Sequence, residues 1–457
     1  MKSALNDFFP YKVCINLDTR PDRWARAKER FARHHLNDVI RFPAVDGARL
    51  EPPDGWNDVP GALGCLHSHL SVVGEARKRR APTVLIFEDD VDFDEQLNEK
   101  FFKCAGQIPS DWDMILLGGS HWEEPVRWSD NIFKATSTAA THAYALKQTI
   151  YDAFIALNGE ALHPVDVNNT LLQRDFNCYC LMPHLAWQEE GYSDIAGRTI
   201  NTWRVKESIV LCSAEMEQVL KKTAVVIAHK SENGDAVSAR NLNFLINHYA
   251  SLSPDIAIVI VDRDRVMLRG NDERGMMNDE HGLPCSSFRV HHSSFPLTRS
   301  RAFNSGFEMF DEGRDFFIFT DSDIVAPWPD IKANLIMCLK YDFVSLFKDV
   351  FALNREDTQA VLNGRLNSLD VYGNRRESGT SLSSGGCIMT RKGFLTIGGW
   401  DEMKAKVKRQ KAKMELSPGS EEEVQSRKVR QLLTVFESPN PAVRLHSCEP
   451  IDRRAGK

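Results

Sequence analysis

The stretch that decides the fold is Val84-Leu85-Ile86-Phe87-Glu88-Asp89-Asp90, an apolar run that ends in three acidic residues. A second run of this kind is Phe316-Phe317-Ile318-Phe319-Thr320-Asp321-Ser322-Asp323. Short apolar runs bounded by charge are typical of strands that are buried on both faces of an α/β sheet. Ligands of such sheets bind beyond the carboxyl ends of the strands. The two runs therefore predict two binding sites.

The spacing of the acids indicates what these sites bind. Residues i and i+2 of an extended chain point the same way, so Glu88 and Asp90 would share one direction, as would Asp321 and Asp323. Each pair would then present two hard oxygen ligands to one divalent cation. Mg²⁺ or Mn²⁺ held in this way completes its shell with substrate phosphates. We therefore predict two nucleotide-diphosphate sites on one chain.

The bulk composition narrows the class of protein. With 457 residues the chain is too long for one ordinary domain, and its 42% hydrophobic and 26% charged residues are typical of soluble globular proteins. A net charge of −6 gives no general attraction to nucleic acid or to an anionic membrane. No apolar stretch approaches the length of a membrane span, and the N-terminus lacks a signal-peptide core. We expect a cytoplasmic protein that does not bind nucleic acid.

The ten cysteines are scattered along the chain and form no CxxC pair, and we expect them to be reduced. Cys178 and Cys180 alternate along an expected strand, where buried thiols are far more common than metal ligands.

Strands and helices alternate along the chain, and the alternation starts twice. This pattern predicts an α/β fold with an open, mostly parallel, Rossmann-type sheet in each half. We expect domains at 1–205 and 223–457, joined by a segment at 206–222 that is helical from 207 to 222. The expected strands are 12–17, 84–87, 114–117, 223–229, 256–261 and 316–320, and the expected helices are 20–34, 63–80, 239–250 and 299–310.

The first half carries a series of ordered motifs over residues 11–196. They are Ile15–Arg23, Phe42–Gly47, Gly64–His69, Glu88–Asp90, His163–Asp166, Pro183–Gln188 and Ser193–Asp194. This order resembles glycosyltransferase family 25, which includes bacterial lipooligosaccharide galactosyltransferases and collagen galactosyltransferases. The resemblance implies a domain of GT-A type.

The resemblance also gives roles to single residues. Arg20 and Arg23 follow the first strand, where their guanidinium groups would meet a diphosphate or a nucleotide base; a solvated helix start is the alternative. Glu88 and Asp89 would contact the nucleotide sugar. Asp166 is a candidate base or acceptor-positioning residue, and its spacing fits a helix N-cap equally well.

Two histidines stand close together at an expected helix start. His67 and His69 are two residues apart and would not share a helix face, so a two-histidine metal site is disfavoured. One of them would point into the cleft or make a structural hydrogen bond.

The second half resembles the GT-A domain shared by β-1,4-galactosyltransferases, polypeptide N-acetylgalactosaminyltransferases and chondroitin-type polymerases. The motifs that carry this resemblance are Arg299–Gly306, Asp321–Asp323, Ser384–Phe394 and Gly398–Glu402. The resemblance implies that Arg301, Asn304 and Asp321 contact the nucleotide. Asp401 and Glu402 would bind donor or acceptor sugar hydroxyls.

The same resemblance implies a catalytic base and a third metal ligand near the end of the chain. The base would be Glu421, with Glu422 as the next choice, and His446 would complete an Asp/Asp/His set that suits Mn²⁺. The sequence departs from the family pattern here, because the acids are glutamates without a Trp-Gly-rich lead-in. A basic run over 404–413 precedes them, which is either a solvated helix face or a mobile lid.

Together these features predict a bifunctional, metal-dependent glycosyltransferase with Mn²⁺ or Mg²⁺ at each site. The resemblances imply that each domain transfers a sugar, galactose being the family's example, from a UDP-sugar to a glycan hydroxyl with inversion, as in lipopolysaccharide biosynthesis. A lipid-linked acceptor would give peripheral membrane association. The alternative is one active domain with a degenerate carbohydrate-binding or scaffolding partner. A phosphohydrolase is disfavoured, since no Asp-x-Asp-Gly-Thr run follows either strand.

Overall fold

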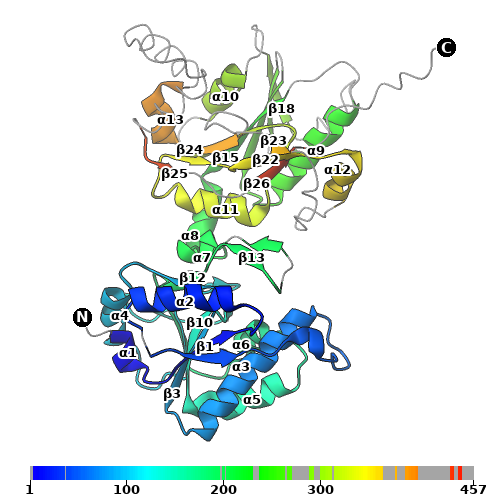
Figure 1. Ribbon diagram of the computed structural model, residues 1–457. Helices are drawn as coiled ribbons and strands as arrows, with labels where there is room; N and C mark the ends of the chain where they lie inside the picture. Colours follow the sequence, from blue (N-terminus) through cyan, green and yellow to red (C-terminus); the bar gives the residue numbers. More distant parts are fainter. Residues whose placement is uncertain are drawn as a thin grey trace, which may run out of the picture. The chain divides into compact units, whose positions relative to one another are not determined.

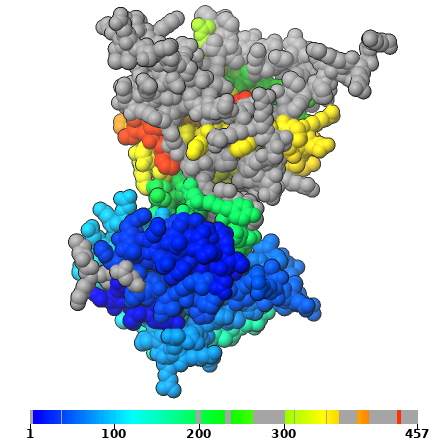
Figure 2. Space-filling model, viewed as in Figure 1, coloured from blue at the N-terminus to red at the C-terminus, as the bar shows by residue number. Residues whose placement is uncertain are grey.

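The computed structural model divides the chain into two compact units between Ser213 and Ala214. This break lies within the expected connecting segment at 206–222. Helix is formed there only at α7 (Trp203–Lys206) and α8 (Ala214–Lys221), so the expected continuous helix over 207–222 is shorter than predicted. Residues outside the described part are grey in Figures 1 and 2. The structure describes residues 4–36, 38–195, 198–200, 202–229, 236–262, 265–269, 288–292, 299–310, 313–363, 376–377, 386–399, 433–436 and 441–444.

The first unit is built on an eight-stranded sheet with helices on both faces (Figure 1). In spatial order the strands are β2 (Ile40–Pro43), β1 (Lys12–Asn16), β3 (Thr83–Glu88), β10 (Ala143–Lys147), β5 (Met114–Leu116), β11 (Cys178–Leu181), β8 (Ile132–Lys134) and β7 (Val126–Arg127). The helices are α1 (Ala4–Phe8), α2 (Pro21–Arg33), α3 (Pro60–Lys78), α4 (Leu97–Ala105), α5 (Tyr151–Gly159) and α6 (Val165–Leu172).

The sheet is mixed, so the prediction of a mostly parallel sheet is wrong. Strands β2, β1 and β3 pair in parallel, as do β5 and β11, but β10 runs antiparallel to both of its neighbours and β8 runs antiparallel to β11 and β7. Parallel neighbours need a crossover, usually a helix, whereas antiparallel ones do not. Between β5 and β10 the chain forms short strands and no helix, which leaves β10 antiparallel.

Strand β3 is buried on both faces, as its apolar run predicts. Leu85 and Phe87 pack into one core together with Phe31 of α2 and Phe101 of α4. Val84 and Ile86 point the other way, into a second core beneath α3 and α5. Burial on both faces holds the end of β3, and the acids that follow it, in a fixed place.

Two glycines fix α3 against the turn that follows β2. A Cβ atom on Gly64 would lie 2.5 Å from the backbone nitrogen of Gly47 and 2.6 Å from the carbonyl oxygen of Val45. A Cβ atom on Gly47 would lie 1.8 Å from the carbonyl oxygen of Pro60. No side chain fits at either position, so the backbones of the turn and the helix are in direct contact.

A short two-stranded sheet continues the chain beyond the acids. Strands β4 (Val91–Phe93) and β12 (Ala186–Gln188) pair antiparallel, with Val91 opposite Gln188. The backbone nitrogen of Glu189 donates to the carbonyl oxygen of Asp90 at 2.7 Å. The segment after β12, which continues into β13 (Gly191–Ser193), therefore lies beside the acidic turn.

The second unit also has an eight-stranded mixed sheet. Its parallel pairs are β16–β15, β15–β19 and β21–β25, and its other neighbours are antiparallel, so the expected mostly parallel sheet is wrong here too. In spatial order the strands are β18 (Phe288–His292), β17 (Arg265–Arg269), β16 (Ala257–Asp262), β15 (Thr223–His229), β19 (Phe316–Asp321), β24 (Gly386–Thr390), β21 (Phe343–Ser345) and β25 (Val435–Phe436).

Aromatic side chains fill the core of the second unit. Phe317 and Phe319 of β19 pack against Phe307 of α10 (Arg299–Glu308) and Phe394 of α13 (Arg391–Ile397). The rings of Phe307 and Phe394 stack with centroids 4.0 Å apart. The unit also contains α9 (Ala236–Ala250), α11 (Trp328–Met337), α12 (Arg355–Leu362) and a small sheet of β20 (Ile324–Val325), β26 (Pro441–Arg444), β22 (Asp349–Ala352) and β23 (Arg376–Glu377).

The prediction of buried thiols on an alternating strand is met. Cys178 and Cys180 are fully buried on β11, which confirms them as core thiols. Among the helices of the described ranges, none combines the length and the apolar character needed to cross a membrane.

Candidate functional site

The acidic turn after β3 holds three carboxylates with different partners. Glu88 is the last residue of β3, and Asp89 and Asp90 follow it. Asp89 accepts a hydrogen bond from Nδ2 of Asn16 at 2.6 Å, and its other oxygen lies 3.1 Å from a guanidinium nitrogen of Arg23. Asp89 therefore holds Arg23 in place, and Glu88 and Asp90 are the residues that precede and follow Asp89.

The two flanking acids each bury an oxygen that makes no hydrogen bond to any residue that the structure describes. For Asp90 this atom is Oδ1; for Glu88 it is Oε1, which instead forms an ion pair with Nε2 of His69 at 3.3 Å. Burial, followed by the charges of Glu88 and Asp89, raises the pKa of Asp90 to about 8. Burial alone would raise the pKa of Glu88 too, but His69, with Thr141 and His142 nearby, holds it below its usual value. Buried acceptors without a donor fit a bound divalent cation.

A cavity of about 480 Å³ opens beside Glu88. Asp166 lines it from the first turn of α6, and burial raises the pKa of this carboxyl. The cap position of α6 belongs to Pro164, so Asp166 does not occupy the N-cap. A partly buried carboxylate with a raised pKa in a cavity suits proton abstraction. Further lining residues are Asp58, Cys65, His142, Gln188 and Ser193.

A second cavity, of about 190 Å³, lies between α2 and the segment after β12. Arg20, Arg23 and Arg26 line it together with Asp90 and residues 189–192. Arg23 donates to the carbonyl oxygen of Tyr192 at 2.7 Å, and Arg20 is paired with Asp22 and Asp194. The two predicted arginines thus meet at one cavity.

Arg26 is a further cationic residue of this cavity, and the motif did not point to it. Its spacing from Arg23 places both on one face of α2 and could have revealed it. Its Nε atom lies 3.6 Å from Glu189. Three guanidinium groups around one cavity suit an anion such as a diphosphate.

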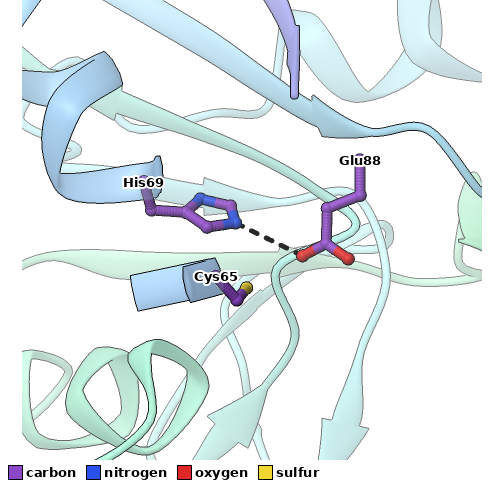
Figure 3. A group of neighbouring side chains, drawn as sticks. All are labelled: Cys65, His69 and Glu88. Atoms are coloured by element: carbon purple, nitrogen blue, oxygen red, sulfur yellow. Dashed lines mark ion pairs between the residues drawn. The ribbon is translucent and has the colours of Figure 1, made fainter. Parts of the chain in front are cut away.

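Only one of the two predicted histidines meets the acids. His67 and His69 lie inside α3, which begins at Pro60, and not at a helix start as expected. His69 is fully buried; its Nδ1 contacts the Tyr144 hydroxyl at 2.9 Å and its Nε2 lies 3.3 Å from Oε1 of Glu88 (Figure 3). The missed neighbour is Cys65, one helical turn before His69.

The second unit places polar residues at the ends of three adjacent parallel strands. His229 ends β15 opposite Asp262 at the end of β16, and Asp321 ends β19 opposite Ala228. Nδ1 of His229 lies 2.9 Å from the Ser322 hydroxyl. Sequence reasoning missed His229 and Asp262, although both follow apolar strands as Asp321 does.

Asp323 has a cationic partner. Nε of Arg444, on β26, lies 3.4 Å from a carboxylate oxygen of Asp323. Both side chains are about one third exposed, at 32% and 29%. This pair distinguishes Asp323 from Asp90.

The remaining predicted residues of this unit lie partly in the described ranges. Arg301 is exposed on α10. Asn304 lies against Gly399, where an added Cβ atom would come within 3.0 Å of its side-chain oxygen. Five predicted residues lie outside the described residues: Asp401, Glu402, Glu421, Glu422 and His446. The basic run at 404–413 lies outside them as well.

Comparison with known proteins matches the part of the chain that forms this first site. Residues 10–168 match the profile of glycosyltransferase family 25 (LPS biosynthesis protein). The match includes Arg20, Arg23, the acids of 88–90 and Asp166, and it confirms the resemblance over these residues. The resemblance of the second half stays a prediction.

The curated relatives match this chain at low sequence identity and over part of its length. The chain is 26% identical over 141 residues to a putative glycosyltransferase of Acanthamoeba polyphaga mimivirus, covering 28% of this chain and 44% of the relative. It is 27% identical over 157 residues to the inactive glycosyltransferase 25 family member 3 of Homo sapiens, covering 29% and 26%. The chain thus spans less than half the length of these relatives.

Among solved structures, the chain is similar to a glycosyltransferase involved in the glycosylation of the major capsid of PBCV-1. The identity is 12%, the match covers 33% of this chain and 66% of that one, and the TM-score is 0.22. A score this low does not assign a fold.

Proposed function

We propose that the first unit is a metal-dependent glycosyltransferase that uses a nucleotide-sugar donor, in our reading a UDP-sugar. The observation that carries the proposal is the buried Oδ1 of Asp90, beside Glu88 in the acidic turn, which no donor of the described structure satisfies. The family match over residues 10–168 supports it.

In this proposal the smaller cavity binds the diphosphate of the donor, and the larger cavity binds the acceptor. Glu88 and Asp90 would hold Mn²⁺ or Mg²⁺, which stabilises the negative charge that develops on a departing diphosphate. Arg20, Arg23 and Arg26 bind the diphosphate from the smaller cavity. Asp89 orients Arg23 through the 3.1 Å contact between their side chains.

The larger cavity receives the acceptor. Asp166 takes the proton of the acceptor hydroxyl, and the oxygen then attacks the anomeric carbon of the donor sugar from the side opposite the diphosphate. This course inverts the anomeric configuration. The raised pKa of Asp166 makes its carboxylate a better base than an exposed aspartate.

For the second unit we propose a second transfer of the same kind. Asp321 and Asp323 with His446 would hold the cation, Arg301 and Asn304 would contact the nucleotide, and Glu421 or Glu422 would act as base. Asp401 and Glu402 would bind sugar hydroxyls. The strand ends that gather Asp321, His229 and Asp262 support a site at this edge of the sheet.

The contact between Arg444 and Asp323 favours the alternative, a second unit that binds carbohydrate without transferring it. An arginine that already neutralises Asp323 weakens the case for a cation there. The human relative, whose printed name calls it inactive, shows that relatives without activity are named in this family.

The acceptor is a glycan hydroxyl, and a lipid-linked acceptor would bring the protein to a membrane surface. Galactose as the sugar, lipopolysaccharide biosynthesis as the setting and the cytoplasm as the location complete the proposal.

The test of the first activity is a screen of UDP-sugars for release of UDP by the full chain with Mn²⁺, with and without chelator. The reference chain and every variant carry Asp323→Asn, which removes the proposed second transfer from the readout. Glu88→Gln and Asp90→Asn should abolish release, and Mn²⁺ or Mg²⁺ should restore the chelated reference chain. Asp92→Asn is the matched control, since Asp92 lies two residues further along β4 and outside both cavities. Full turnover in chelator, or in Asp90→Asn, would contradict the proposal.

A further inference from the structure

A buried group of three different ligand types lies behind the acidic turn. Cys65, His69 and Glu88 each offer one potential ligand atom, and the three atoms all lie within 4.8 Å of one another. Figure 3 shows the side chains of α3 and the end of β3 converging on one point. Because Cys65 and His69 are four residues apart, they share one face of the helix.

Two of the three atoms face each other inside the protein. Nε2 of His69 and Oε1 of Glu88 are both buried and lie 3.3 Å apart as an ion pair, and neither atom makes a hydrogen bond within the described residues. The His69 side chain is fully buried and that of Glu88 is 15% exposed. Buried polar atoms with unused bonding capacity are costly, and a cation bound between these two atoms would use that capacity.

The other nitrogen of His69 is fixed from behind. Nδ1 contacts the hydroxyl of Tyr144 on β10 at 2.9 Å. Metal-bound histidines commonly use their second nitrogen in this way, which sets the tautomer and aims the first nitrogen at the ion. In the tautomer in which Nδ1 donates to Tyr144, Nε2 carries the lone pair that a cation needs.

We propose that Cys65, His69 and Glu88 bind a Zn²⁺ ion, with the fourth position open to the larger cavity. Thiolate, imidazole and carboxylate are the ligands that Zn²⁺ takes, and three protein ligands with one open position are the pattern of its reactive sites. Cys65 and Glu88 both line the cavity, which provides the path of entry.

The proposed ion differs from the cation of the donor site. Mn²⁺ and Mg²⁺ prefer oxygen ligands, whereas a thiolate selects softer ions such as Zn²⁺. Glu88 is common to both sites, but Zn²⁺ binding does not require that the chain transfers sugar. The inference therefore stands or falls separately from the proposed function.

The experiment uses the full chain, stripped with chelator and titrated with Zn²⁺ against a chromophoric competitor. We expect one high-affinity Zn²⁺ that requires all three residues. Co²⁺ in place of Zn²⁺ should give the thiolate-to-cobalt absorption band. Cys65→Ser should remove this band, and Cys65→Ser, His69→Gln and Glu88→Gln should each weaken Zn²⁺ binding. Tyr144→Phe should weaken it by about 10–100-fold, as expected for loss of a group behind a ligand.

Matched controls come from the same unit. Cys212→Ser removes an exposed cysteine, and His67→Ala removes the histidine two residues from His69; both should bind Zn²⁺ as the wild type does. Thermal melts without metal identify any variant that fails to fold, and Cys65→Ser is the mildest change. If Cys65→Ser keeps the cobalt band, or if the wild type binds Zn²⁺ no better than Cys65→Ser, the proposal is wrong.

Discussion

The two units carry the same motif at the end of a buried strand, but an arginine meets it at a different acid in each. In the first unit Arg23 pairs with the middle acid, Asp89. In the second unit Arg444 pairs with the last acid, Asp323. The first arrangement leaves Asp90 with a buried oxygen that no described donor satisfies, whereas the second supplies a cation to the corresponding acid. The position of one arginine therefore separates two sites that look alike in sequence.

The largest expected effect comes from removing the flanking acid in each unit. Asp90→Asn should lower the first transfer by about 10³-fold or more, because stabilisation by a metal is worth several kcal/mol. If the second unit is active, Asp323→Asn should do the same to the second transfer alone. The measurement is the rate of each transfer with separate acceptors. Loss of both transfers from either change in a folded protein would contradict two independent sites.

The bases should affect turnover and leave donor binding alone. Asp166→Asn in the first unit and Glu421→Gln in the second should each reduce kcat by about 10²–10⁴-fold. Donor affinity should stay near the wild-type value, because a base meets the acceptor hydroxyl. Glu422→Gln should be milder than Glu421→Gln. Steady-state kinetics with UDP-sugar binding measured by calorimetry check both statements, and near-normal kcat would place the base elsewhere.

The arginine of the second unit provides a finer test. Arg444→Ala should raise the affinity of the second unit for Mn²⁺ by about tenfold at most, since the pair is partly exposed and such contacts are worth about 1 kcal/mol or less. Electron paramagnetic resonance of Mn²⁺, with the first site removed by Asp90→Asn, measures this affinity. Unchanged Mn²⁺ binding would mean that Arg444 is not what distinguishes the two sites.

Buried histidines should make the two units differ in stability at acidic pH. Burial lowers the pKa of His121 to about 4 and that of His184 to about 3 in the first unit, and their Nε2 atoms lie 3.0 Å apart. Burial also lowers the pKa of His248 in the second unit to about 4. In each case the unfolded state binds the proton more readily, so stability is present above about pH 6.5 and is lost as the pH falls toward 4.

At pH 5 each such histidine should cost about 2 kcal/mol, so the first unit should be destabilised more than the second. Hydrogen exchange of core amides at pH 7 and pH 5, corrected for the intrinsic exchange rate, compares the two units. His121→Gln is the control variant for the first unit. An equal loss of exchange protection in both units would show that His121 and His184 do not destabilise the first unit at pH 5.

Much of the framework followed from local pattern. The apolar run of β3, the alternation of Cys178 with Cys180 and the helix that starts at Pro21 depend on neighbours in sequence, and the structure confirms them. The direction of β10 did not follow, because an apolar strand such as Ala143–Lys147 reads the same in either direction. Only the absence of a crossover helix decides it.

The site could be predicted as far as its motifs reached. Arg20, Arg23, Glu88 and Asp166 were identified from the sequence, and the structure brings them to two cavities around one strand end. The partners of these residues could not be predicted, because Tyr144 and Arg444 are distant in sequence from the side chains they contact. Pairing across such distances is a property of the fold.

The contact between Gly47 and Gly64 has a consequence for how such a chain can change by descent. A substitution at either glycine puts a Cβ atom within 3 Å of the other segment's backbone, and a change at the other position would not relieve it. Neither mutation can therefore rescue the other, so neither order of the two substitutions gives a chain that keeps this contact. Cys65 follows Gly64 directly, so the same contact fixes the position of its backbone. Evolution can therefore remove this thiol by substitution but cannot move it by shifting the helix.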